Sequence, residues 1–232
     1  MTKVKNHFNT HYTFADFRKS LEFIRFYVST EVNKVKGFIK KCESIVLNKY
    51  KLRRHSMSLL VLSYPEIWEK DFEWIQKIRK EYDELYYKVA GPHFTIVFPV
   101  FNMEPDIFIK HIKNMSENIK TFDFTMRCAV IVKDSFNEYS HVFLVPDEGY
   151  SHIVKLHDRL YTGLLLPELR LDIPFIPHVG VGNSISPETC KSLADRLNQE
   201  NFAILGTVKD LDIVEYNNDT VKTIEKIALA KI

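Results

Sequence analysis

The chain has 232 residues, of which 45% are hydrophobic and 27% are charged, with seven glycines and nine prolines. This composition is ordinary for a globular protein and excludes a low-complexity or disordered chain. The net charge of +2 hides an asymmetry, because residues 1–55 hold 13 Lys or Arg against four Asp or Glu, whereas the rest holds 19 against 26. We therefore expect two parts with separate roles, a basic amphipathic helical extension over residues 1–55 and a domain over residues 56–232.

The sequence also indicates where the protein works. No apolar run approaches the length that crosses a bilayer, and the polar start of the chain lacks the apolar stretch of a secretory signal. The three cysteines, Cys42, Cys128 and Cys190, lie far apart and form neither a disulfide framework nor a metal-ligand spacing. We expect a reducing, cytoplasmic setting.

The N-terminal extension carries a heptad pattern that starts at Thr13 and Asp16, a helix-start signal. Glu31 interrupts the apolar stripe, whose members are Phe14, Phe17, Leu21, Ile24, Val28, Val35, Phe38, Cys42 and Ile45. Residues 13–54 fit three alternatives: a helix packed on the main domain, a self-associating coiled coil, or a basic arm that contacts nucleic acid or an anionic membrane.

From residue 56 onward, strand patterns alternate with helix patterns. Apolar, β-branched or alternating runs predict strands over 56–64, 91–99, 122–133, 139–145, 176–182, 203–216 and 220–230. Apolar residues at helical spacing predict helices over 66–87, 105–119, 149–165 and 186–201. This order predicts an α+β fold of two lobes, in which two antiparallel-rich sheets carry helices on their outer faces and enclose a central cleft.

Two of the predicted strands begin in the same unusual way, with a histidine directly after a proline. His93 follows Pro92, and His178 follows Pro177. Because residues two apart on a strand share a face, His93 should project together with Thr95. We expect the two strands to lie side by side and to aim both imidazoles into one groove. Such a pair supplies a base and an acid near neutral pH, which suits phosphoryl transfer without a metal.

A structural interpretation stands beside the catalytic one. A single histidine followed two residues later by threonine is commonly a hydrogen-bonded structural residue at a strand start. Two Pro-His strand starts in similar surroundings favour the paired catalytic role. His141, His152 and His157 match no metal-ligand spacing, and the sequence has no glycine-rich phosphate loop, so we expect neither a metal nor a cofactor.

The paired motifs and the order of elements resemble the two-histidine phosphoesterases, the superfamily of 2′-5′ RNA ligases and cyclic nucleotide phosphodiesterases. The resemblance covers roughly residues 56–232. The family pattern is two copies of His-x-Thr/Ser-x on strands that line a cleft, and residues 93–96 (HFTI) match it fully. Residues 177–181 (PHVGV) match it in the histidine and the apolar positions, but Gly180 stands where the family has Thr or Ser.

The resemblance implies an enzyme that acts on RNA 2′,3′-cyclic phosphate ends or 2′-5′ phosphodiester links, without metal or ATP. His93 and His178 would exchange the roles of acid and base, and Thr95 would donate to a phosphate oxygen. Apart from the resemblance, glycine leaves space at position 180, so backbone N–H groups near Gly180 and Gly182 could approach the phosphate in place of the hydroxyl. Four aromatic residues are further candidates for the groove, each with a core position as the alternative: Tyr64, Phe98, Phe136 and Phe175.

Three functions remain open at this point. The first is a phosphoesterase acting on RNA ends or on small cyclic or 2′-5′-linked nucleotides. The second is a catalytically impaired module that binds nucleotide or RNA, because Gly180 replaces the hydroxyl residue. The third is an interaction protein that works through the heptads of residues 13–54.

Overall fold

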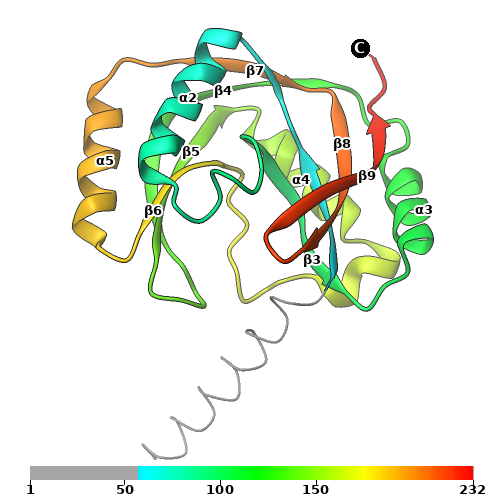
Figure 1. Ribbon diagram of the computed structural model, residues 1–232. Helices are drawn as coiled ribbons and strands as arrows, with labels where there is room; N and C mark the ends of the chain where they lie inside the picture. Colours follow the sequence, from blue (N-terminus) through cyan, green and yellow to red (C-terminus); the bar gives the residue numbers. More distant parts are fainter. Residues whose placement is uncertain (1–56, 232) are drawn as a thin grey trace, which may run out of the picture. The chain divides into compact units, whose positions relative to one another are not determined.

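Two antiparallel sheets form the frame of the protein in the computed structural model, which describes residues 57–231 (Figure 1). Sheet A has the strand order β3 (Phe94–Phe101), β1 (Ser58–Ser63), β8 (Asp210–Asn217) and β9 (Thr220–Ala228). Sheet B has the order β2 (Glu66–Ile67), β7 (Ile204–Val208), β4 (Phe122–Lys133), β5 (Ser140–Glu148) and β6 (Val179–Ser184). The predicted α+β fold with two antiparallel sheets is therefore confirmed.

The helices pack in two groups. They are α2 (Glu69–Tyr82), α3 (Pro105–Ser116), α4 (Tyr150–Leu160), the 3₁₀ helix η1 (Gly163–Glu168) and α5 (Pro187–Gln199). Helix α5 packs on β4, β5 and β6, and α2 packs on β6, so both cover sheet B. Helix α4 contacts β3 and β5, and α3 packs against α4.

The sheets meet through apolar side chains that alternate along β3. Phe94 and Ile96 are fully buried, whereas Thr95 between them is half-buried. The Phe94 ring meets the Phe124 ring of sheet B edge-on, with 5.0 Å between the centroids. One face of β3 therefore belongs to the core between the sheets, and the other face, with Thr95, is left for a different role.

Local turn and cap chemistry agrees with the sequence. The β8–β9 hairpin turns at Asn218 and Asp219, whose φ angles of 49° and 57° are those of a type I′ turn. Ser186 caps α5 by accepting a hydrogen bond from the Thr189 N–H at 3.2 Å, and Pro187 takes the first helical position. Both predictions are confirmed.

Three predicted elements differ from the structure. The run 203–216 is two strands rather than one, because the chain leaves sheet B after β7 and enters sheet A at β8. Val208 and Leu211 are both fully buried, so the apolar pattern continues across the crossing and conceals it. The helix predicted over 66–87 is shorter, since residues 66–67 pair with β7 and the segment after Tyr82 turns away. The helix predicted over 149–165 stops at Leu160, ahead of Gly163 with its positive φ of 53°.

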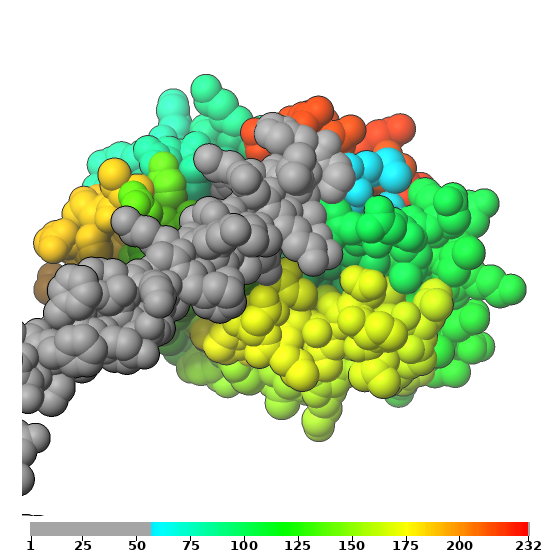
Figure 2. Space-filling view, turned by 90° about the horizontal axis from the view of Figure 1, so that it is seen from below, coloured from blue at the N-terminus to red at the C-terminus, as the bar shows by residue number. Residues whose placement is uncertain are grey.

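The segment between α4 and β6 runs over the surface. Leu164, Leu166 and Leu171 are 45%, 60% and 87% exposed. In Figure 2 this yellow segment forms a ridge on the face seen from below. It leads directly to the second histidine motif.

The helical extension predicted over residues 1–55 lies outside the described residues, so self-association and polyanion contact through residues 13–54 stay predictions. Within residues 57–231, the helices are too short or too polar to cross a membrane. In the same range, His, Cys, Asp and Glu side chains form no group of three that could hold a metal ion.

Candidate functional site

His93 lies immediately before β3, at an edge of sheet A. Its ring Nδ1 is 2.7 Å from the carbonyl oxygen of Gly91, two residues earlier in the chain. The Tyr64 ring faces it edge-on, with 5.7 Å between centroids, and also lies 3.8 Å from where a side chain on Gly91 would begin. Tyr64 therefore packs beside both Gly91 and the His93 ring.

His178 repeats this arrangement immediately before β6, at an edge of sheet B. Its Nδ1 is 2.5 Å from the carbonyl oxygen of Ile176, again two residues earlier. The ring stacks on Phe143 of β5, with a centroid distance of 3.6 Å and an angle of 16° between the planes. The motif strands are thus edge strands of different sheets and do not pair, which corrects the expectation that they lie side by side.

The two hydrogen bonds assign the same tautomer to both histidines. A carbonyl oxygen only accepts, so each Nδ1 carries the proton and donates it. In the neutral ring Nε2 is then the unprotonated nitrogen. Among the described residues neither Nε2 has a hydrogen-bond partner, so both are available to a ligand.

The two imidazoles lie within electrostatic range of each other. Burial lowers the pKa of His178, the bond to Ile176 opposes the shift, and the neighbouring imidazoles of His93 and His141 add to it, so that the pKa is about 4. Burial also lowers the pKa of His93. At neutral pH both rings are therefore neutral, and a bound anion would favour protonation of one of them.

Thr95 and Gly180 occupy matching positions two residues after the histidines. Thr95 pairs with Leu62 of β1 and is half-buried on the face of β3 away from the core. A side chain on Gly180 would meet no atom within 4 Å, so this position faces open space. A threonine or serine would fit there without displacing a neighbour.

Gly182 differs from Gly180 in its surroundings. A Cβ on Gly182 would lie 2.7 Å from Leu193 of α5 and 3.1 Å from Tyr82 of α2, so glycine is required for the close packing of these helices. A β-bulge between the β5–β6 pairs at these two glycines turns them toward different surroundings. Gly182 therefore serves helix packing, which explains its presence without a phosphate contact.

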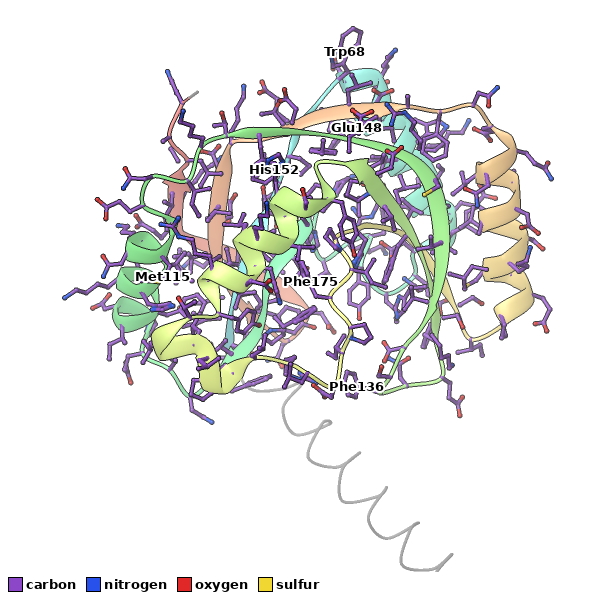
Figure 3. The ribbon with its side chains drawn as sticks, turned by 180° about the vertical axis from the view of Figure 1, so that it is seen from behind. Trp68, Met115, Phe136, Glu148, His152 and Phe175 are labelled. Atoms are coloured by element: carbon purple, nitrogen blue, oxygen red, sulfur yellow. The ribbon has the colours of Figure 1, made fainter. Side chains whose placement is uncertain are left out.

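The predicted aromatic residues divide into separate groups. Tyr64 lies beside His93, as described above. Phe98 and Phe175 pack around His157 of α4: the Phe175 ring stacks on it at 3.6 Å, and the Phe98 ring meets it edge-on at 6.1 Å. Phe136 lies under the guanidinium of Arg170 at 5.2 Å. Figure 3 shows Phe175 beside α4 and Phe136 at the lower end of the molecule.

A buried polar network that the sequence analysis missed joins the two motif segments. Arg79 of α2 donates to the carbonyl oxygen of Ala90, three residues before His93, at 2.8 Å and to the Asp83 carboxylate at 3.0 Å. The other Asp83 oxygen accepts from the Asn183 side chain of β6 at 2.5 Å. The network thus connects the segment that precedes His93 with β6, the strand that follows His178. The signals in the sequence were the i, i+4 pair of Arg79 and Asp83 and an asparagine in an apolar strand.

A second missed group supports His178 from the other side. His141 Nε2 is 3.0 Å from the Asp134 carboxylate, and the His141 ring lies 5.6 Å from Phe143, which stacks on His178. Burial acts to raise the pKa of Asp134, but hydrogen bonds from His141 and from the Phe136 N–H outweigh it and lower that pKa. The 134–139 loop is thereby connected to the second motif.

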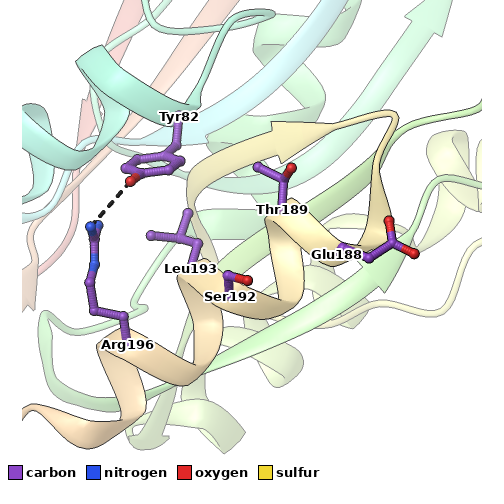
Figure 4. A pocket seen from close by; sticks show the side chains of 6 residues that line it. All are labelled: Tyr82, Glu188, Thr189, Ser192, Leu193 and Arg196. Carbon is purple, nitrogen blue, oxygen red and sulfur yellow. Dashed lines mark hydrogen bonds between the residues drawn. The ribbon is translucent and has the colours of Figure 1, made fainter.

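A surface pocket of about 420 Å³ lies away from the motif histidines, between α2 and α5 (Figure 4). Arg196 lies over the Tyr82 ring at 5.0 Å and donates to its hydroxyl at 3.1 Å. These side chains hold the two helices over Gly182, so we interpret this pocket as packing that supports β6.

A protein-family model matches residues 65–220, and its description is the 2′-5′ RNA ligase superfamily. The chain belongs to this superfamily. The matched region contains both histidine motifs and most of the described strands. A search of curated protein sequences finds no match.

Solved structures of similar fold are distant in sequence. TT0787 of Thermus thermophilus is 12% identical with a TM-score of 0.50, over 75% of this chain and 98% of that one. LigT of E. coli, solved in complex with 3′-AMP, is 11% identical with a TM-score of 0.46, over 76% and 99%. Usb1 of Kluyveromyces marxianus is 7% identical with a TM-score of 0.46, over 76% and 99%. The likeness to TT0787 agrees with the superfamily's fold.

The polar network predicts a stability effect. Asn183→Leu should lower the free energy of unfolding by about 1–3 kcal/mol, because the buried Asp83 carboxylate loses a donor. Urea denaturation measures the change, and Asn114→Leu on the exposed surface of α3 is the control. An Asn183 variant as stable as the wild type would contradict a structural role for the network.

The lowered pKa of His178 predicts a dependence of stability on pH. Between an unfolded-state pKa near 6.5 and a folded-state pKa of about 4, the unfolded chain binds more protons, so stability falls as the pH drops through this window. The contribution is about 3 kcal/mol, from a pKa difference of about 2.5. His178→Gln should reduce the slope of unfolding free energy against pH from 6.5 to 4. An unchanged slope would show that His178 titrates normally.

Proposed function

We propose that this protein is a phosphoesterase that uses His93 and His178 as an acid–base pair on RNA 2′,3′-cyclic phosphate ends or 2′-5′ phosphodiester links, without a metal ion. The superfamily supports the reaction class. The matched tautomers of the two histidines are the observation that carries the proposal. Each Nδ1 is held by a backbone carbonyl, which leaves both Nε2 atoms for the substrate.

The chemistry needs one proton to move in and one to move out. In hydrolysis of a cyclic phosphate, one neutral imidazole takes a proton from water through Nε2 as the water oxygen bonds to phosphorus. The bond from phosphorus to one ribose oxygen breaks, and the other ring, as imidazolium, gives that oxygen its proton. The phosphate's negative charge raises the pKa of the ring that must be protonated. The roles exchange in the reverse reaction, so neither histidine has a fixed role.

Thr95 would stabilise the phosphate as charge develops on its non-bridging oxygens. Its hydroxyl is on the same side of the strand as His93, and one such donor is typically worth about 10²–10³ in rate. Gly180 offers no second hydroxyl. We therefore propose an enzyme that works with one side-chain donor at the phosphate.

A second candidate function follows from the same glycine. If a single donor is insufficient, the protein is a module that binds nucleotide or RNA ends without turnover. The open space at Gly180 favours this candidate, because the equivalent position of the first motif, Thr95, carries a hydroxyl.

The paired role predicts the loss of turnover in two single variants. Wild-type protein should hydrolyse 2′,3′-cyclic nucleotides in the presence of EDTA, and His93→Ala and His178→Ala should each lower kcat/KM by about 10² or more. Product formation followed by chromatography measures this. His152→Ala on the exposed surface of α4 is the matched control and should retain activity. Full activity in either motif variant would reject the pair.

Restoring the second hydroxyl distinguishes the two candidates. Gly180→Thr places a donor in open space, so it should raise kcat by about tenfold or more with little change in stability. Gly182→Thr is the contrasting variant and should destabilise the fold, because Leu193 and Tyr82 occupy that space. A folded Gly180→Thr protein that binds cyclic nucleotide with no gain in rate would argue against a phosphate at this position.

A further inference from the structure

Asp212 of β8 is a buried carboxylate with an unused acceptor. The residue is 5% exposed, and its Oδ2 has no hydrogen-bond partner among the described residues. Burial raises the pKa of this carboxyl, the charges of Lys226 and Asp210 act on it in opposite directions, and the Thr223 side chain bonds to it. An unpaired buried carboxylate oxygen is unfavourable, so its presence calls for a partner that binds there.

The strand register places this carboxylate on the same face as Thr95. Thr95 pairs with Leu62, Leu62 pairs with Asp212, and direct partners in antiparallel strands share a face. Thr95 and Asp212 are two strands apart, which corresponds to roughly 10 Å. A nucleotide spans such a distance between its phosphate and the far edge of its base.

Tyr64 lies near both the His93 motif and Asp212. It follows Leu62 by two residues, and its ring meets His93 edge-on at 5.7 Å. Burial and then the negative charge of Asp212 raise the pKa of Tyr64, so the phenol ring is within range of both residues. A base that stacks on this ring would point one edge toward Asp212.

We propose that Asp212 accepts a hydrogen bond from the amino group of the substrate's base while the phosphate lies at His93 and Thr95. This inference rests on the proposed function. A carboxylate only accepts. Adenine and cytosine carry an exocyclic amino donor at the edge where guanine and uracil carry a carbonyl oxygen. The site therefore selects adenine and cytosine over guanine and uracil.

Asp210 provides a matched control on the same strand and face. It lies two residues from Asp212, but its carboxylate is paired with Lys226 at 3.2 Å. Asp210→Asn removes the same charge from the same strand without touching the unpaired oxygen. Asp212→Asn keeps the size of the side chain and replaces the oxygen acceptor by an amide.

The experiment measures Kd and kcat/KM of wild type, Asp212→Asn and Asp210→Asn for the 2′,3′-cyclic phosphates of adenosine, cytidine, guanosine and uridine. Wild type and Asp210→Asn should favour the adenosine and cytidine compounds over the guanosine and uridine compounds by roughly tenfold to a hundredfold. Asp212→Asn should lose this preference, and its melting temperature should not fall.

The outcomes separate the inference from the proposed function. If nucleotides bind and are turned over but wild type does not discriminate, or Asp212→Asn discriminates as wild type does, the role of Asp212 is overturned and the histidine chemistry stands. If Asp210→Asn loses the preference equally, general charge is responsible and the inference again fails. If none of the four nucleotides binds, the proposed function fails and the inference falls with it.

Discussion

The hydrogen bond from each motif imidazole to the carbonyl two residues earlier is the interaction on which the site depends. It is short and local, and the proline before each histidine fixes the backbone that supplies the carbonyl. It assigns the proton to Nδ1 and leaves Nε2 as the unprotonated nitrogen. The same hydrogen bond occurs at the edges of two different sheets. The two histidines therefore have the same local geometry although their neighbouring residues differ.

The surroundings of the two motifs are unequal, although the motifs match. Around His93 the support is polar and reaches through Ala90 to the buried Arg79. Around His178 it is aromatic, through the stacked ring of Phe143. Asn183 of β6 donates to Asp83, so the polar network is connected to the strands of both motifs. The two glycines of β6 also differ in their surroundings: Gly180 faces open space, and Gly182 packs against α2 and α5.

Local features of the fold and of the candidate site can be predicted from the sequence, whereas features that depend on strand pairing cannot. The Pro-His pairs, the Ser186 cap and the Asn218–Asp219 turn act over a few residues, so local chemistry predicted them. The division of 203–216 between two sheets was hidden, because burial looks alike on either side of the crossing. Phe143, Asn183 and Asp212 matter through pairing with distant strands, and register is not visible in a single sequence.

In the proposed function both imidazoles contact the oxygens of one phosphate group. The most direct measurement is a titration of ¹⁵N-histidine-labelled protein with a 2′,3′-cyclic nucleotide analogue that is not hydrolysed, followed by NMR. We expect the Nε2 resonances of His93 and His178 to shift together, along one binding curve with one ligand per chain. Shifts of one ring alone, or of neither ring under saturating ligand, would contradict this expectation.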